Sequence, residues 1–169
     1  MSQSYTYPHS LASLSTREAV TDAVHRALIG CDRNDAPIFA SAWAGEDVTF
    51  EVHDGSKKVI PGLSVIRKAV FESVGPMDTT HSIANVRVDV QDGADTAHLT
   101  ATATAQHCPP GRGREPDGPK FLVGSQYSVD LVKGSEESGA WKIKKWVLSV
   151  TWTQGDPSVM QSIRSASAS

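Results

Sequence analysis

The 169-residue sequence lacks the features that mark several large classes of protein. No apolar run approaches the roughly 20 residues that a membrane-spanning helix needs. No basic stripe stands out, and the formal net charge is −3 with a pI near 6.0, so nucleic acid is not an expected partner. Residues 1–13 also lack the charged start and apolar stretch of a secretory signal, so we expect a cytoplasmic protein.

Cysteine and cofactor motifs are equally scarce. The only cysteines, Cys31 and Cys108, are too few for a disulfide framework; two reduced thiols are favoured, and a bridge between them stays open. There is no His-Glu-x-x-His, Cys-x-x-Cys, Gly-x-Ser-x-Gly or Walker-type phosphate loop. The spacing of histidines and aspartates does not favour a metal, so we expect neither a metal nor another cofactor.

The length fits one domain, which we place at residues 15–156 between a flexible arm, 1–14, and a flexible tail, 157–169. Ser15 and Glu18 form a capping box, and apolar residues then recur at helical spacing as far as Leu28. Further helices are predicted over 36–44 and 63–73, with a strand around 48–52 between them.

The second half of the chain has a different pattern. Strand-like runs cover about 80–90, 95–107, 120–132 and 141–154, separated by short Gly- and Pro-containing connections. Short connections between consecutive strands favour an antiparallel, curved sheet. Helices followed by strands indicate an α+β domain with the helices packed on one face of the sheet.

Three polar residues stand where an acid/base pocket needs them: Asp32, His81 and His107. Imidazoles paired with a carboxylate move protons near neutral pH without a coenzyme. In the strand that ends at His107, this residue shares the apolar face and His98 the polar face. The alternative is a core histidine with a satisfied hydrogen bond.

For the other two candidates, Asp32 and His81, the apolar pattern does not fix the direction of the side chain. Asp32 falls four residues after Leu28, so it continues the inward face of the helix, unless it merely ends the helix and faces water. Strict alternation points His81 away from Val86, Val88 and Val90, unless a β-bulge or strong curvature reverses that direction or both faces of the strand are partly covered.

Two aromatic side chains are candidates for binding a substrate. Tyr127 shares the apolar face of its strand, where a structural role is equally compatible. Trp152 shares a face with Trp146 near the end of the last strand, where it either lines a ligand mouth or belongs to the core. Glu51 lies opposite an apolar face and is expected to be solvated.

Taken together, these motifs resemble the NTF2-like superfamily, in its SnoaL-like branch close to scytalone dehydratase and its relatives. The resemblance runs from about Arg17 to Gly155. It rests on the order of the following pieces: Cys31-Asp32-Arg33-Asn34-Asp35, Asp47-Val48-Thr49-Phe50, Pro61-Gly62, Thr80-His81-Ser82-Ile83-Ala84-Asn85, His107, Gly124-Ser125-Gln126-Tyr127, Gly139-Ala140-Trp141-Lys142-Ile143, and Trp152 with Gly155.

The resemblance implies a cone-shaped α+β barrel, a curved, mostly antiparallel sheet wrapped by N-terminal helices around a deep pocket. It implies that Asp32, His81 and His107 are catalytic and that Ser125 and Tyr127 lie near substrate-holding positions. Two family tyrosines that polarise the substrate carbonyl are replaced, one by Cys31 and one by Glu51 or Val52, which argues against the same substrate.

The function expected on this basis is that of a cofactor-independent lyase or isomerase for a small hydrophobic cyclic metabolite of secondary metabolism. A non-catalytic NTF2-like binding or assembly module is the alternative, and a ring-hydroxylating dioxygenase β-subunit is a third. The β-branched polar face formed by Thr100, Thr102 and Thr104 predicts a homodimer or homotrimer that associates through the outer face of the sheet.

Overall fold

The computed structural model of the protein describes residue 8 and residues 10–136 and 139–160. The helical elements are α1 (Thr16–Arg33), α2 (Ala36–Ser41), α3 (Leu63–Ile66), a π-helical turn η1 (Arg67–Phe71), α4 (Glu72–Val74) and a 3-10 turn η2 (Pro157–Met160). The strands are β1 (Thr49–His53), β2 (Lys57–Pro61), β3 (Asp78–Asp89), β4 (Thr96–Cys108), β5 (Phe121–Lys133) and β6 (Trp141–Gly155).

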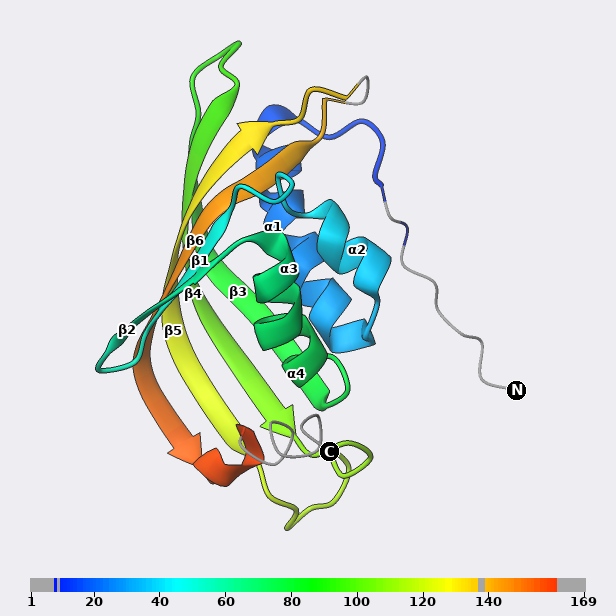
Figure 1. The fold of residues 1–169 in the computed structure, drawn as a ribbon, viewed down its shortest axis with the longest axis vertical. Helices are drawn as coiled ribbons and strands as arrows, with labels where there is room; N and C mark the ends of the chain where they lie inside the picture. Colours follow the sequence, from blue (N-terminus) through cyan, green and yellow to red (C-terminus); the bar gives the residue numbers. More distant parts are fainter. Residues whose placement is uncertain (1–7, 9, 137–138, 161–169) are drawn as a thin grey trace.

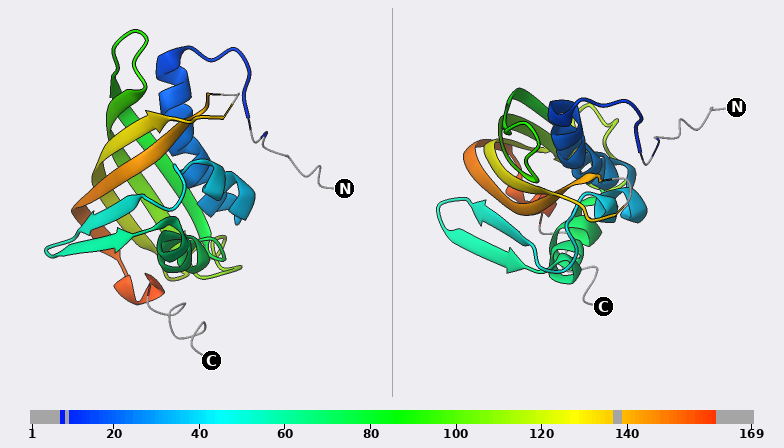
Figure 2. Two further views of the ribbon diagram at one scale, coloured as in Figure 1. Left: turned by 45° about the horizontal axis from the view of Figure 1, so that its top comes forward. Right: turned by 90° about the horizontal axis from the view of Figure 1, so that it is seen from above.

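These strands form one curved sheet in the order β2-β1-β6-β5-β4-β3, with the helices on its concave side (Figures 1 and 2). β3 to β6 follow one another as an antiparallel meander, and β1 runs parallel to β6. The predicted α+β class and the mixed, mostly antiparallel sheet are confirmed. The sheet is not closed, however, because β2 and β3 are its two free edges. The sequence pattern also missed β2, whose side chains are mostly exposed.

The first helix begins and ends where its capping residues predict. The Ser15 hydroxyl accepts from Glu18 N, and the Glu18 carboxylate accepts from Ser15 N at 2.8 Å. At the other end Asn34 adopts a left-handed conformation with φ 51° and closes the helix. The cap thereby fixes Asp32 in the last turn. Among the described residues, no helix is long and apolar enough to cross a membrane.

Two contacts hold α1 against the elements around it. Gly30 lies so close to α2 that a Cβ atom there would stand 2.6 Å from the backbone nitrogen of Phe39. Arg26, 8% exposed, donates to the carbonyl oxygens of Ser41 and Trp141 and pairs with Asp22. Its guanidinium therefore joins α1 to the end of α2 and to the start of β6.

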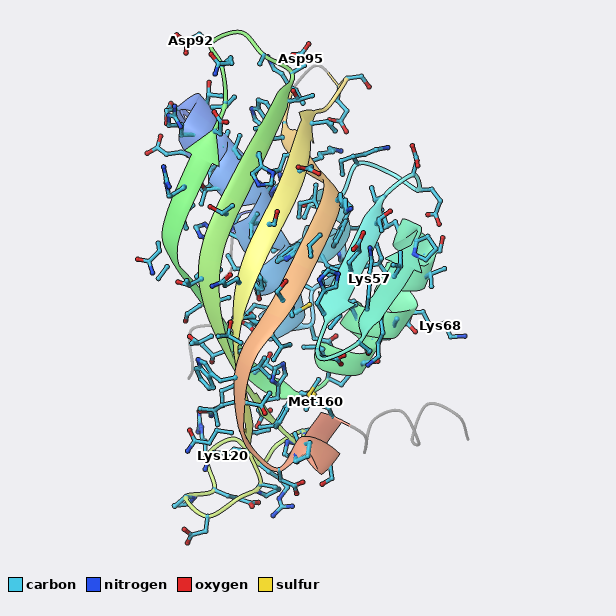
Figure 3. All side chains as sticks on the ribbon, turned by 90° about the vertical axis from the view of Figure 1, so that its left-hand side faces the viewer. Lys57, Lys68, Asp92, Asp95, Lys120 and Met160 are labelled. Atoms are coloured by element: carbon cyan, nitrogen blue, oxygen red, sulfur yellow. The ribbon has the colours of Figure 1, made fainter. Side chains whose placement is uncertain are left out.

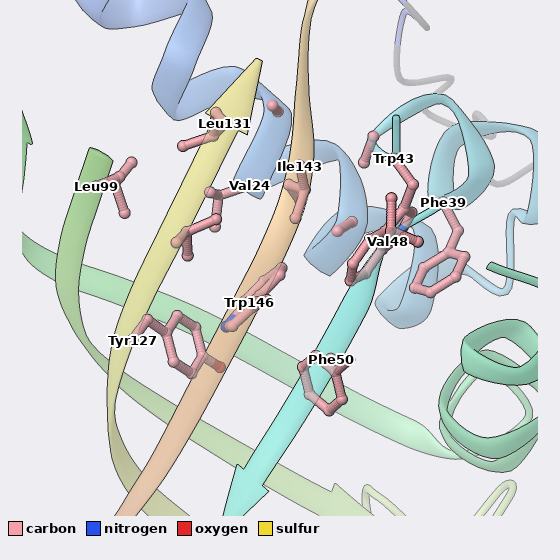
Figure 4. Close-up of a cluster of buried hydrophobic side chains, with 14 of the residues drawn as sticks. Val24, Phe39, Trp43, Val48, Phe50, Leu99, Tyr127, Leu131, Ile143 and Trp146 are labelled. Carbon is pink, nitrogen blue, oxygen red and sulfur yellow. The ribbon is translucent and has the colours of Figure 1, made fainter. Parts of the chain in front are cut away.

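The space between helices and sheet is filled toward α2 by an aromatic cluster (Figure 4). Trp43 stacks on Trp146 with ring centroids 6.1 Å apart, and Tyr127 meets Trp146 edge-on at 4.9 Å. Phe39 and Phe50 also contact Trp43. The resemblance predicts a deep pocket, but this part of the interior is packed with side chains.

Two strands change their side-chain phase through β-bulges. In β3 the partners step from Ala84–Thr102 to Arg87–Thr100, which leaves one extra residue, and Asn85 has φ 52°. The bulge therefore brings Val86 onto the same face as His81. In β6 a register shift leaves Trp152 opposite Gly124 after Val150 has paired with Ser125.

The convex face of the sheet is polar, and Figure 3 looks onto it. Thr100, Thr102 and Thr104 are exposed there, as their alternation predicts. His98 also lies on this side, with Nδ1 2.7 Å from Asp130 Oδ1. The face thus carries a second histidine–carboxylate pair, remote from the concave side.

We predict that this convex face joins copies of the chain in a homodimer or homotrimer, because rows of threonine suit contact between sheets. Static light scattering at micromolar concentration should give two or three times the chain mass of 18.1 kDa. A single species near the chain mass would contradict the prediction. Thr102→Arg should reduce the measured mass if the face is the interface.

The chain remains packed beyond the predicted end of the domain at residue 156. Val159 in η2 is 2% exposed, and Met160 packs against the hydrophobic core. Most of the predicted N-terminal arm and the tail from residue 161 lie outside the described residues.

Candidate active site

Asp32 and His81 form the central pair of the site. His81 Nδ1 lies 2.6 Å from Asp32 Oδ1, and the backbone N–H of His81 donates to Oδ2 at 2.9 Å. The Thr79 hydroxyl donates to Oδ1 at 2.7 Å. The carboxylate at the end of α1 is therefore held by three donors from the start of β3.

The β3 bulge explains why His81 faces Asp32. Alternation without a bulge directs the valines and His81 to opposite sides, whereas the extra residue at Asn85 lets His81, Ile83 and Val86 share one side. A bulge is one of the conditions under which the sequence allows His81 to point inward. The structure contains it, and His81 lies on the concave side.

His107 lies beside His81 on the neighbouring strand β4. The two imidazole centroids are 5.4 Å apart, and their planes are nearly perpendicular at 87°. His107 is 5% exposed, and its Nδ1 lies 3.3 Å from the carbonyl oxygen of Phe121. Asp32, His81 and His107, which come from three different elements, therefore meet in space.

The protonation of the three groups follows from these contacts. Burial raises the pKa of Asp32, but the hydrogen bonds and charge of His81 and the Thr79 hydroxyl outweigh it and hold that pKa below its ordinary value. Burial, together with the charge that His81 carries when it is protonated, lowers the pKa of His107 to about 4. Near pH 7 Asp32 is thus ionised and His107 is neutral.

The neighbouring acceptors also fix the tautomers of both rings. A carbonyl oxygen only accepts, so the neutral ring of His107 carries its proton on Nδ1 and leaves Nε2 as an acceptor. The ionised Asp32 likewise places a proton on Nδ1 of His81. Each imidazole can therefore offer Nε2 to a ligand.

The low pKa of His107 predicts a pH-dependent stability. An imidazole in the unfolded chain titrates near 6.5, so between pH 6.5 and about 4 the unfolded chain binds a proton that the folded protein does not. The contribution is complete above pH 6.5 and is lost as the pH falls toward 4. Between pH 7 and pH 4, the unfolding free energy of the native protein should fall by roughly 3 kcal/mol more than that of His107→Gln. Urea denaturation measures both proteins, and parallel declines would contradict this prediction.

A cleft of about 230 Å³ gives access to Asp32 and His81. It lies in the seam between α1 and the edge strand β3, and its other lining residues are His25, Leu28, Ile29, Ser82 and Ile83. A larger hollow of about 620 Å³ lies farther along the same seam, away from this pair. We take the smaller cleft as the candidate reaction site because it contains the paired acid/base groups.

The predicted substrate-binding residues separate into two groups. Ser125 is 6% exposed and Tyr127 is 4% exposed, both on the concave side, and Ala103 lies opposite Ser125. Burial raises the pKa of the Tyr127 phenol to about 12, so it is neutral and able to donate. Trp152 is 45% exposed and lies over Gly124 on the convex side, so the parity that grouped it with Trp146 is wrong.

The remaining sequence candidates lie outside this cluster. Glu51 was expected to be solvated, yet it is 5% exposed under ion pairs with Lys57 and Lys145. Cys31 and Cys108 are free and buried, and burial raises the pKa of the Cys31 thiol to about 12. Within the described ranges, no three His, Cys, Asp or Glu side chains are grouped as a metal site.

Two further contributors to the site were not predicted from the sequence. Thr79 precedes His81 by two residues on the same strand, so period-two alternation was a sufficient signal for it. His25 precedes Asp32 by seven residues, which is two helical turns on one face of α1. The Phe121 carbonyl that orients His107 has no sequence signal, because it depends on strand register.

Comparisons with known proteins agree with this architecture. The SnoaL-like domain family model matches residues 12–147. Terrestric acid biosynthesis cluster protein E of Penicillium crustosum is 36% identical over 144 residues, covering 85% of this chain and 88% of that protein.

Solved structures show the same fold at low identity. The Kfla4162 protein of Kribbella flavida has a TM-score of 0.69 at 19% identity, covering 86% of this chain and 96% of that one. A putative scytalone dehydratase from Novosphingobium aromaticivorans has a TM-score of 0.65 at 20% identity, covering 82% and 85%. An NTF2-like superfamily protein from Salmonella enterica has a TM-score of 0.63 at 15% identity, covering 80% and 91%.

Proposed function

Because the chain belongs to the SnoaL-like domain family, within the NTF2-like superfamily, we propose that it is a cofactor-independent acid/base lyase or isomerase. Its substrate is a small hydrophobic cyclic metabolite, polyketide, terpenoid or alkaloid, of secondary metabolism. The observation that carries the proposal is the Asp32–His81 pair, which lines an accessible cleft and has the buried, neutral His107 next to His81. The relative from a biosynthesis cluster supports the metabolic setting.

In the proposed reaction, Nε2 of His81 removes a proton from the carbon next to a substrate carbonyl. The ionised Asp32, 2.6 Å from Nδ1, stabilises the imidazolium that forms. In a dehydration, the same Nε2–H protonates the departing hydroxyl, the carbon–oxygen bond breaks, and water leaves. In an isomerisation of a β,γ-unsaturated ketone, the proton returns to the γ-carbon of the dienolate, and the double bond moves into conjugation with the carbonyl.

His107 is suited to a different task in this scheme. Its pKa of about 4 makes it a poor proton donor at pH 7, while its free Nε2 accepts a hydrogen bond. We assign it to hold the hydroxyl group of the substrate at a fixed place beside His81. On β4, Ala105 pairs with His81 and Ala103 pairs with Ser125. We propose that Ser125 and Tyr127 on β5 bind the substrate's other oxygen.

A panel of cyclic β-hydroxy ketones in deuterated buffer tests this function. We expect exchange of the proton next to the carbonyl, or elimination of water, to be detected by NMR with the native protein. His81→Ala should remove it, and His98→Ala on the convex face should not. Exchange that is equal in all three proteins would overturn the proposal.

The packed aromatic interior favours one alternative, a non-catalytic binding or assembly module. In that case members of the panel bind without any exchange, and the Asp32–His81 pair serves only to orient a ligand. The same NMR samples distinguish the two functions, because ligand shifts without deuterium incorporation indicate binding alone.

A further inference from the structure

The cleft at the Asp32–His81 pair and a second, larger hollow lie in line along the seam between α1 and β3. The small one, about 230 Å³, contains Asp32 and His81, and the large one, about 620 Å³, lies toward the start of α1. His25 lines both. A molecule that extends from the pair along the seam must therefore pass His25.

Because of the β3 bulge, β3 turns mostly apolar side chains toward α1 along both hollows. His81 and Ile83 line the small cleft before the bulge, and Val86 and Val88 line the large hollow after it. The phase shift at Asn85 directs both pairs toward α1. Strict alternation would have turned polar side chains toward the hollow instead.

The large hollow is suited to an uncharged apolar group. Leu11, Leu14, Val86 and Val88 line it, and Leu11 is 52% exposed. Its rim also carries the exposed Arg87 and three charged side chains that are engaged within the protein. These three are Arg17 with the Val88 carbonyl, Glu18 with the Ser15 backbone N–H, and Asp22 with Arg26.

We propose that the seam binds an elongated substrate, with an oxygenated ring against Asp32 and His81 and an unbranched alkyl chain in the hollow beyond His25. The combined space falls in the range of about 300–1,000 Å³ that holds drug-sized ligands. This inference rests on the proposed function for the place of the reacting ring. It goes beyond that function in assigning the chain-length specificity to the residues around Leu11.

A series of 4-alkylphenols, from phenol to 4-hexylphenol, tests the proposal by binding alone. NMR titration of the His81 imidazole signals gives the dissociation constants. Each buried methylene should tighten binding by about three- to fourfold. A dissociation constant that does not change with chain length would overturn the proposal.

Two variants of the large hollow locate the chain. Leu11→Asp places a charge at an exposed loop position, so it spares the fold, and Thr21→Trp fills the hollow from α1. In both variants the affinity should no longer rise with the length of the alkyl chain, while the dissociation constant of phenol stays unchanged. Val59→Asp is the matched control, because Val59 is 51% exposed on the distant strand β2. A chain-length gain that persists in Leu11→Asp and Thr21→Trp would contradict the assigned place.

Failure of this inference and failure of the proposed function give different results. If the dissociation constant does not depend on chain length but the native protein catalyses deuterium exchange, only the binding of the alkyl chain in the seam is rejected. If longer alkyl chains bind more tightly but the native protein catalyses no exchange, only the proposed enzymatic function is rejected.

Discussion

Asp32→Asn is expected to lower turnover by about 10²- to 10⁴-fold, the range for loss of acid/base assistance or of its orientation. The change removes the negative charge 2.6 Å from Nδ1 of His81 and weakens the acceptor set used by Thr79 and the His81 backbone. The imidazolium loses its counter-charge, and the ring loses the group that fixes its tautomer. Initial rates with the best substrate of the panel measure the effect.

The convex face provides a matched control for this substitution. Asp130 lies 2.7 Å from Nδ1 of His98, almost the distance found for Asp32 and His81, but both side chains are largely exposed. Asp130→Asn should leave turnover within about twofold, because exposed pairs contribute little. A thermal melt for each variant separates lost chemistry from lost folding. Equal losses in Asp32→Asn and Asp130→Asn would show that the concave pair is not the reaction centre.

Gly30→Ala is expected to destabilise the fold at neutral pH. The added Cβ would stand 2.6 Å from the nitrogen and 2.7 Å from the Cα of Phe39, so α1 and α2 must separate. Such overpacking typically costs about 1–3 kcal/mol, and backbone contacts this short place the change at or above the upper end. The gain in helix propensity of about 1 kcal/mol offsets only part of it. Chemical denaturation should show a net loss of roughly 2–3 kcal/mol in unfolding free energy.

Two further variants identify the cause of that loss. Thr21→Ala on the same helix tests propensity without a clash and should change the unfolding free energy by no more than about 0.5 kcal/mol. Phe39→Ala combined with Gly30→Ala should give no rescue, because the clash includes the backbone of Phe39 as well as its Cβ. An unfolding free energy for Gly30→Ala equal to that of the native protein would refute the close approach of α1 and α2.

Local signals in the sequence predicted most of the framework. Ser15 and Glu18 predict the start of α1 because both cap bonds form within four residues. The inward face of β4 follows from plain alternation, since this strand pairs with β5 without a shift, and His107 is placed correctly for that reason. Long helices and strands whose apolar residues recur at one constant spacing can therefore be predicted from the sequence.

The wrong or undecided predictions concern strands in which a β-bulge interrupts the alternation of side chains. They also concern residues whose surroundings are formed by distant parts of the chain. The bulges at Asn85 and between Val150 and Trp152 each invert the faces of the residues after them, which left His81 undecided and misplaced Trp152. Glu51 is buried by lysines from β2 and β6, a contact that no local pattern contains. The α1–β3 cleft likewise depends on packing between elements about 50 residues apart.

The connectivity of the sheet also bears on the order in which the protein folds. The meander from β3 to β6 closes through short loops, whereas Thr49 on β1 must find Lys145 on β6 across most of the chain. Loop closure over such a separation is slow compared with hairpin formation. During synthesis α1 leaves the ribosome before β3, and the strand that carries His81 follows about 50 residues after the end of α1. The side of α1 that packs on β3 is therefore without its partner for that interval, and we expect it to depend on protection from aggregation until β3 is made.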